Sequence, residues 1–154
     1  MENLTLIRKS NDDPDVNKLI KALDMELWSI YNDRQAFFDQ HNILPKGTNV
    51  FVAYMNNDPV GCGAFRKMDK EAAEVKRMFV RESERGKGIG RKILKALEIW
   101  AFETQFKYTR LETGNKQHTA IALYQKSGYQ IIPNYPPYEN TPESICMEKL
   151  LTKS

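Results

Sequence analysis

Cysteine and histidine are scarce in this sequence, with two of each among 154 residues. Cys62 and Cys146 are far apart and lack the close spacing of metal ligands, and only His41 and His118 could assist them. A zinc site is therefore not expected, and we predict a protein without a metal. Both cysteines lie in apolar, strand-like runs, which favours a role as small core residues.

Long apolar runs are also missing. No stretch approaches the ~20 apolar residues that span a bilayer, and the first residues do not form the basic and apolar regions of a signal peptide. The net charge is only +3, from 23 basic and 20 acidic residues, which is too mild an excess for a nucleic-acid-binding protein. We expect one cytoplasmic domain over residues 1–154, with neither nucleic acid nor a membrane as partner.

Glycine is sparse too, with 8 residues, but Gly86, Gly88 and Gly90 alternate within one short stretch. The preceding residues 74–80 are rich in β-branched and aromatic side chains, which predicts a strand. From Ile89 onward apolar residues recur every four positions, which predicts a helix. The three glycines therefore lie between a strand and the N-terminus of a helix.

This glycine turn has the chemistry of an anion site. A helix N-terminus presents backbone N–H groups without intrahelical partners, and the helix dipole adds partial positive charge. Glycine has no Cβ atom, so a ligand can approach the backbone closely. Four cations surround the glycines: Arg85, Lys87, Arg91 and Lys92. We predict a site for phosphate, most specifically a diphosphate; the alternative is a tight turn before a solvated, basic helix start.

Two well-known phosphate loops do not match this turn. A Walker A loop requires Gly-Lys-Ser/Thr at its end, whereas Gly90 is followed by Arg91 and Lys92. In a dinucleotide fingerprint, G-x-G-x-x-G, the third glycine would come one position later than Gly90, and the whole loop would follow its strand directly. The turn instead resembles the acetyl-coenzyme A loop of the GNAT superfamily of N-acetyltransferases, R/Q-x-x-G-x-G/A. Arg85, Gly88 and Gly90 match that pattern.

A second motif supports the same resemblance. Residues 120–129, AIALYQKSGY, resemble the second GNAT signature, A-x-x-L-Y-x-K-x-G-F/Y. Many members have asparagine seven residues before the tyrosine, where this chain has Gln117. Since the glutamine amide can also donate and accept hydrogen bonds, we expect Gln117 to contact the cofactor with altered geometry.

The order of predicted elements indicates an α+β fold. Periodicity and turn residues predict two helices after the first strand, and one helix after each of the fourth and fifth strands. The predicted strands are residues 4–8, 48–55, 60–68, 74–80, 108–112, 129–132 and 144–150. They predict a GNAT-like mixed, mainly antiparallel central sheet of about seven strands, with helices on both faces. The helical crossover makes the 74–80 and 108–112 strands parallel.

The resemblance implies transfer of acetyl from acetyl-CoA, as cosubstrate, to a primary amine by direct attack in a ternary complex. It implies that backbone groups of Met78, Phe79 and Val80 hold the pantetheine. It also implies that Tyr124 protonates the leaving thiolate; the alternative is that Tyr124 only packs in the core. The diphosphate would bind N–H groups of the glycine turn: Arg85, Gly86, Lys87, Gly88, Ile89 and Gly90.

A substrate amine of pKa near ~10 must lose a proton before it attacks a thioester, and a carboxylate can accept that proton. Glu74, which opens the central strand, is the first candidate base, and Glu112 at the end of the neighbouring strand is the second. The alternative for each is an ion pair with one of the nearby cations: Lys76, Arg77 or Arg110.

We expect the acceptor pocket between two aromatic regions, the N-terminal helices around Trp28, Tyr31 and Phe38 and the loop at Tyr135 and Tyr138. These rings could equally fill the core or a homodimer contact. The stiff, proline-containing loop favours a small-molecule amine as acceptor. A protein acetyltransferase acting on lysine or an N-terminus, and a coenzyme A-binding sensor without turnover, remain as alternatives.

Overall fold

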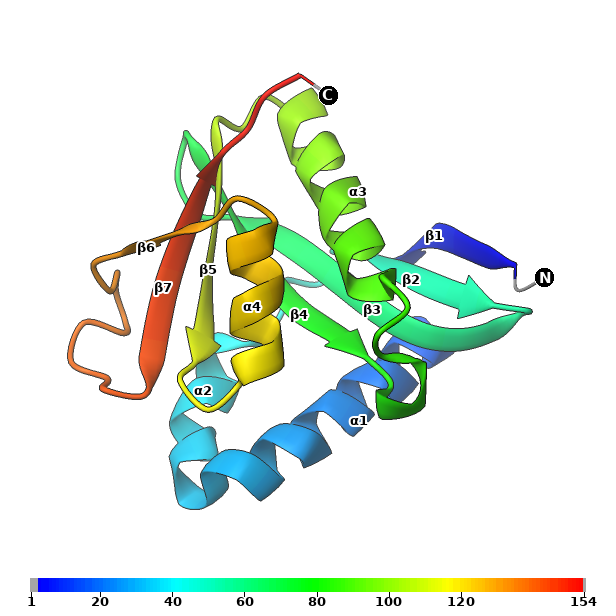
Figure 1. Ribbon diagram of the computed structural model, residues 1–154, viewed down its shortest axis with the longest axis horizontal. Coiled ribbons are helices and arrows are strands. Elements are labelled where there is room, and N and C mark those ends of the chain that lie inside the picture. Colours follow the sequence, from blue (N-terminus) through cyan, green and yellow to red (C-terminus); the bar gives the residue numbers. More distant parts are fainter. Residues whose placement is uncertain (1–2, 154) are drawn as a thin grey trace. The chain divides into compact units, whose positions relative to one another are not determined.

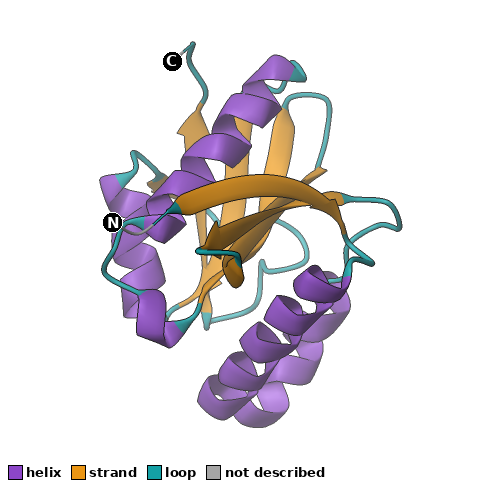
Figure 2. Cartoon of the chain, turned by 90° about the vertical axis from the view of Figure 1, so that its right-hand side faces the viewer, coloured by secondary structure: helices purple, strands orange, loops and turns teal. Residues whose placement is uncertain are grey.

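The computed structural model describes residues 3–153. The prediction of one domain over residues 1–154 includes residues 1, 2 and 154, which lie outside the described residues, and it stays a prediction. Helices and strands make up most of the described chain (Figures 1 and 2). Their order is β1 (Leu4–Ser10), α1 (Pro14–Tyr31), η1 (Asn32–Arg34), α2 (Gln35–His41), β2 (Asn49–Met55), β3 (Asp58–Lys67), β4 (Ala72–Val80), η2 (Glu82–Glu84), α3 (Ile89–Glu103), β5 (Tyr108–Gly114), α4 (His118–Lys126), β6 (Gln130–Ile132) and β7 (Ser144–Leu150).

The strands form a seven-stranded sheet in the order β1-β2-β3-β4-β5-β7-β6. β4 and β5 run parallel, as the helical crossover predicts, while β1–β2, β2–β3, β5–β7 and β6–β7 are antiparallel pairs. The predicted fold class, a mixed and mainly antiparallel sheet of seven strands, is confirmed. No helix within residues 3–153 combines the length and apolar character that a membrane crossing requires.

The chain divides into two compact units. The first comprises the residues up to Arg66 together with Lys76–Leu97, and the second comprises Lys67–Val75 together with the residues from Glu98 onward. β4 and α3 each pass from one unit into the other.

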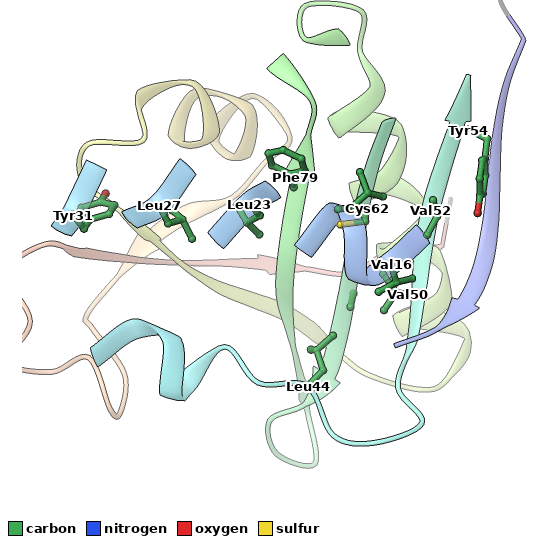
Figure 3. Packing of buried hydrophobic residues seen from close by; sticks show 12 residues of the cluster. Val16, Leu23, Leu27, Tyr31, Leu44, Val50, Val52, Tyr54, Cys62 and Phe79 are labelled. Carbon is green, nitrogen blue, oxygen red and sulfur yellow. The ribbon is translucent and has the colours of Figure 1, made fainter. Parts of the chain in front are cut away.

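The core of the first unit lies under α1 (Figure 3). Asp13 caps this helix by accepting a hydrogen bond from the Asp15 N–H at 2.9 Å, and proline occupies the first helical turn. The buried face of α1 has helical spacing: Val16, Leu19, Leu23, Leu27 and Tyr31. These side chains join apolar residues of β2, β3 and β4: Val50, Val52, Tyr54, Cys62, Ala64 and Phe79.

The start of α3 packs closely on β3 within this unit. A Cβ atom added to Gly63 would lie 2.5 Å from the Met78 Sδ atom and 2.8 Å from a methyl group of Ile93. Close packing therefore favours glycine at this position, because even a methyl group would force the side chains of Met78 and Ile93 to move.

In the second unit β5 pairs along its whole length with β7, from Tyr108↔Leu150 to Gly114↔Ser144. The core includes Leu111, Met147 and Tyr129, and the Tyr129 hydroxyl pairs with the Thr109 hydroxyl at 2.7 Å. α4 is followed by Gly128, whose φ is +97° and whose N–H donates to the Gln125 carbonyl. A glycine in this left-handed conformation is a common end for a helix.

Six of the seven strands differ from the sequence-based prediction by one or two residues at one or both ends, and two of these differences extend β4 and β5. Thr113 and Gly114 lie beyond the predicted strand 108–112, but both are buried and continue β5, because Thr113 pairs with Ile145 in β7. β4 begins at Ala72 rather than Glu74, because Ala72 and Ala73 pair with the start of β5. The residues added to β4 and β5 are small or β-branched. Their extended conformation depends on pairing with a distant segment, which the local sequence does not display.

Candidate functional site

The glycine turn lies in the first unit after η2, with Gly86 and Gly88 before α3 and Gly90 as the second residue of that helix (Figure 1). Gly86 and Gly88 have φ values of +83° and +79°, a conformation that other L-residues rarely adopt. A Cβ atom added to either glycine would find no atom of the described residues within 4 Å. The space over the turn is thus open, and the backbone N–H groups that start α3 are suited to an anionic group such as a diphosphate.

Arg85 connects this turn to its surroundings. Its Nε atom donates to the Val80 carbonyl at 2.8 Å, and its Nη2 atom donates to both carboxylate oxygens of Glu26 on α1, at 2.8 and 3.0 Å. Its guanidinium also lies 5.8 Å from the centre of the Phe79 ring. The Arg85 backbone N–H, predicted to hold the diphosphate, donates to the Glu82 carbonyl at 3.2 Å. Arg85 therefore fixes the turn to the end of β4 and to α1.

Removing the charge of Glu26 should loosen the turn. We expect Glu26→Gln to raise KM for acetyl-CoA about two- to fivefold with kcat nearly unchanged, the range expected for a partly exposed ion pair. Steady-state kinetics with acetyl-CoA as the varied substrate measure this effect. Glu103→Gln, which removes an exposed carboxylate at the end of α3, is the matched control. An unchanged KM in Glu26→Gln, or an equal rise in the control, would contradict the role given to Arg85.

Tyr124 lies on α4 in the second unit and is only 6% exposed. Its ring packs edge-on against Tyr129, with 5.9 Å between ring centroids. Burial raises the pKa of Tyr124 well above its ordinary value, and the charge of Glu112 raises it further. The hydroxyl is therefore protonated at neutral pH and can act as a hydrogen-bond donor.

Each of the two candidate bases accepts a hydrogen bond from a hydroxyl group. Glu74 is 3% exposed, and its Oε2 atom accepts from the Tyr135 hydroxyl at 2.8 Å. Glu112 accepts from the Ser144 hydroxyl at 2.7 Å. Sequence reasoning did not find either contact, since the partners are 61 and 32 residues apart and no local pattern connects them.

The two arginines proposed as ion-pair partners of these carboxylates bind elsewhere. Arg77 donates to Asp24 on α1 at 2.6 Å, and Arg110 pairs with Glu148 at 2.6 Å and with Asp69 at 3.3 Å. Arg77 also has a φ of +59°, which interrupts the regular strand geometry of β4. The periodicity of residues 74–80 gave no sign of this interruption.

The candidate acceptor residues are mostly packed in the interiors of their units. Tyr31 and Phe38 are buried in the first unit with their ring centroids 5.8 Å apart, and Tyr138 is fully buried in the second. Trp28 is 41% exposed, and its Nε1–H donates to Asp39 at 2.9 Å. Packing thus accounts for three of the five rings, and an acceptor pocket formed by Trp28, Tyr31, Phe38, Tyr135 and Tyr138 stays a prediction.

Gln117 lies at the N-cap position of α4. Its side-chain carbonyl accepts from the Gly114 N–H at 3.0 Å and from the Thr113 hydroxyl at 3.4 Å. The glutamine therefore fixes the end of β5 to α4 through its oxygen. The predicted contact between Gln117 and the cofactor stays a prediction.

Both cysteines are completely buried, which confirms their predicted place in the core. Burial raises the pKa of the Cys62 thiol to about 12, so this thiol is not a nucleophile at neutral pH. Within residues 3–153 the structure contains no group of three histidine, cysteine or carboxylate side chains that could hold a metal ion.

Comparison with known proteins gives a consistent result. The model of the acetyltransferase (GNAT) family matches residues 14–129. The IAA acetyltransferase of Azospirillum brasilense is 37% identical over 154 residues, which cover 98% of this chain and 100% of that protein. A solved structure from Klebsiella pneumoniae, described as an acyl-CoA N-acyltransferase, is 35% identical with a TM-score of 0.79 and covers 97% of this chain and 98% of its own. A GNAT acetyltransferase of Elizabethkingia anophelis with acetyl-CoA bound shares the fold, with a TM-score of 0.70 at 23% identity over 97% of this chain and 99% of its own.

Proposed function

Because the chain belongs to the GNAT family of acetyltransferases, we propose that it transfers the acetyl group of acetyl-CoA to the primary amine of a small molecule. The transfer proceeds by direct attack of the amine on the thioester in a ternary complex. The observation that supports this most is the glycine turn at the start of α3, where two positive-φ glycines leave open space over the backbone.

The cosubstrate would be held mainly by backbone groups. N–H groups from Gly86 to Gly90 bind the diphosphate, and Arg85 holds the turn in place through Glu26. Backbone groups of Met78, Phe79 and Val80 hold the pantetheine, and an N–H of this strand donates to the oxyanion of the tetrahedral intermediate. Acetyl-CoA supplies the thioester carbonyl that the amine attacks.

Two proton movements accompany the transfer. Glu74 accepts the proton that the amine loses as its nitrogen forms a bond to the carbonyl carbon; Glu112 is the alternative base. Tyr124 donates a hydrogen bond to the sulfur as the carbon–sulfur bond breaks. Because the pKa of Tyr124 is raised, complete proton transfer to the thiolate is less favourable than for an ordinary tyrosine, so stabilisation of the developing charge is its main contribution.

The proposal also specifies the class of acceptor, the amine of a small molecule. A relative that covers 98% of this chain carries the name IAA acetyltransferase, which is consistent with a small acceptor. The segment between β6 and β7, residues 133–143, contains Tyr135 and the fully buried Tyr138 and is held in place by contacts among its own side chains. A protein acceptor would need a surface that binds an extended chain.

Identification of the acetylated product tests the substrate class. The protein is incubated with acetyl-CoA and a mixture of small amines and lysine-containing peptides of equal total amine concentration, and the products are identified by mass spectrometry. We expect acetylated small amines in clear excess over acetylated peptides. Acetylation of peptides alone would support the protein-acetyltransferase alternative. Calorimetric binding of acetyl-CoA without any acetylated product would support the sensor.

A further inference from the structure

Tyr135 and Glu74 form a partly buried hydroxyl–carboxylate pair in the second unit. Glu74 lies on β4 opposite Arg110 of β5, and Tyr135 lies in the segment between β6 and β7. The Tyr135 hydroxyl donates to the Glu74 Oε2 atom at 2.8 Å, although the two residues are 61 positions apart. Glu74 is only 3% exposed, and a buried carboxylate is stabilised by hydrogen bonds from such donors.

The segment that presents Tyr135 is held by its own contacts. The Asn134 Nδ2 atom donates to the backbone carbonyls of Tyr138, Thr141 and Ser144, at 3.1, 3.4 and 3.2 Å. The Tyr138 N–H donates to the Tyr135 carbonyl at 2.8 Å. The Tyr138 ring is fully buried and packs edge-on against the Tyr135 ring, with centroids 5.7 Å apart. The Tyr135 ring is therefore fixed, and its hydroxyl has a defined direction.

The direction of this hydrogen bond is also defined. Burial raises the pKa of Tyr135 far above its ordinary value, and the neighbouring charge of Glu74 raises it further. The phenol thus keeps its proton at neutral pH and donates to the carboxylate. A carboxylate has about four positions that accept hydrogen bonds, and the Tyr135 hydroxyl occupies one of them on Glu74.

We propose that Tyr135 is a positioning residue for acetyl transfer, whose hydroxyl orients the Glu74 carboxylate toward the attacking amine. The proposal rests on the proposed function, with Glu74 as the base. The amine proton passes to a Glu74 oxygen as the nitrogen–carbon bond forms and the carbon–sulfur bond breaks, and Tyr135 keeps its own proton throughout. This role differs from the predicted one, in which Tyr135 lines the acceptor pocket.

The two roles of Tyr135 predict different kinetics. Tyr135→Phe retains the ring and removes only the hydroxyl. Loss of a hydrogen bond to a charged group should lower kcat on the order of tenfold, with both KM values nearly unchanged. A residue of the pocket wall would instead raise KM for the amine and leave kcat intact. Tyr129→Phe is the matched control, because it also removes a buried hydroxyl that forms a hydrogen bond within the same unit, with Thr109.

A double-mutant cycle then tests whether Tyr135 acts through Glu74. In the Glu74→Gln background, addition of Tyr135→Phe should have almost no further effect on kcat. A readout independent of turnover is the tyrosine ¹³Cζ resonance of the free protein, assigned by its loss in Tyr135→Phe. This resonance should shift in Glu74→Gln and remain in place in Glu112→Gln, because only Glu74 accepts the hydrogen bond.

A raised amine KM at unchanged kcat, or an undiminished effect of Tyr135→Phe in the Glu74→Gln background, would overturn the positioning role. Wild-type kcat in Glu74→Gln would overturn both the base assignment and this proposal, while acetyl transfer itself would stand. Absence of thiol release from the wild type with every amine would contradict the proposed function and remove the reaction that Tyr135 serves. The three failures are thus distinguishable.

Discussion

Tyr124→Phe should lower kcat about a hundredfold or more and leave KM for acetyl-CoA nearly unchanged. The substitution retains the buried ring and its edge-on contact with Tyr129, and it removes only the hydroxyl. That hydroxyl acts on charge that develops at sulfur during bond cleavage, so its loss affects the transition state more than the bound substrates.

The pH dependence of activity should follow the protonation state of the Tyr124 hydroxyl. Burial and the charge of Glu112 raise the pKa of Tyr124, so the donor form persists as the pH increases. Activity should therefore not decline through Tyr124 ionisation until the pH exceeds about 10, the ordinary pKa of tyrosine. A nearby cation would lower the pKa of Tyr124. The two influences found, burial and the carboxylate of Glu112, both raise it.

Thiol release at saturating concentrations of both substrates measures the effect on kcat, and calorimetry with acetyl-CoA measures binding separately. Tyr129→Phe controls for the loss of a buried phenolic hydroxyl in the same unit. Wild-type kcat in folded Tyr124→Phe would exclude Tyr124 from the chemical step, and an equal loss in Tyr129→Phe would indicate a general packing effect.

The second large effect concerns Gly88. Gly88→Val should weaken acetyl-CoA binding at least tenfold, because the valine side chain would occupy the open space over the turn where the diphosphate is expected. With φ at +79°, the substitution also strains the backbone by about 1 kcal/mol or more.

Gly47 provides a closely matched control for that strain. Its φ is +82°, and a Cβ atom added there also meets no described atom within 4 Å. Gly47→Val should therefore lower the free energy of unfolding by an amount similar to Gly88→Val and retain the wild-type affinity for acetyl-CoA. Calorimetric titration of both folded variants with acetyl-CoA measures the two affinities. Unchanged affinity in Gly88→Val, or an equal loss in Gly47→Val, would show that the diphosphate does not bind at this turn.

Much of the fold could be predicted from local sequence patterns. The helical spacing of Val16, Leu19, Leu23 and Leu27 predicts α1, and the glycine turn between β4 and α3 follows from the change of periodicity around Gly86. Residues 144–150 were predicted with the limits that the structure shows. These features depend on residues a few positions apart, which a single sequence displays directly.

The partners of the functional side chains could not be predicted in the same way. Arg85 and Glu26 are 59 residues apart, and Tyr135 and Glu74 are 61 apart. Such contacts depend on how distant segments pack, and the segment between β6 and β7 has no periodicity that would define its conformation. The sequence indicated candidate residues, whereas the structure shows hydrogen bonds that no local pattern displays, from Arg85 to Glu26 and from Tyr135 to Glu74.

Release of free thiol from acetyl-CoA, measured with and without a panel of small amines, tests the central claim most directly. The proposed function predicts that at least one amine increases the rate of thiol release by the wild-type protein in a saturable manner. The same amine should give little thiol with Gly88→Val at a limiting acetyl-CoA concentration, and slow release with Tyr124→Phe. Thiol release that no small amine accelerates, from a folded protein that binds acetyl-CoA, would contradict a small-molecule N-acetyltransferase.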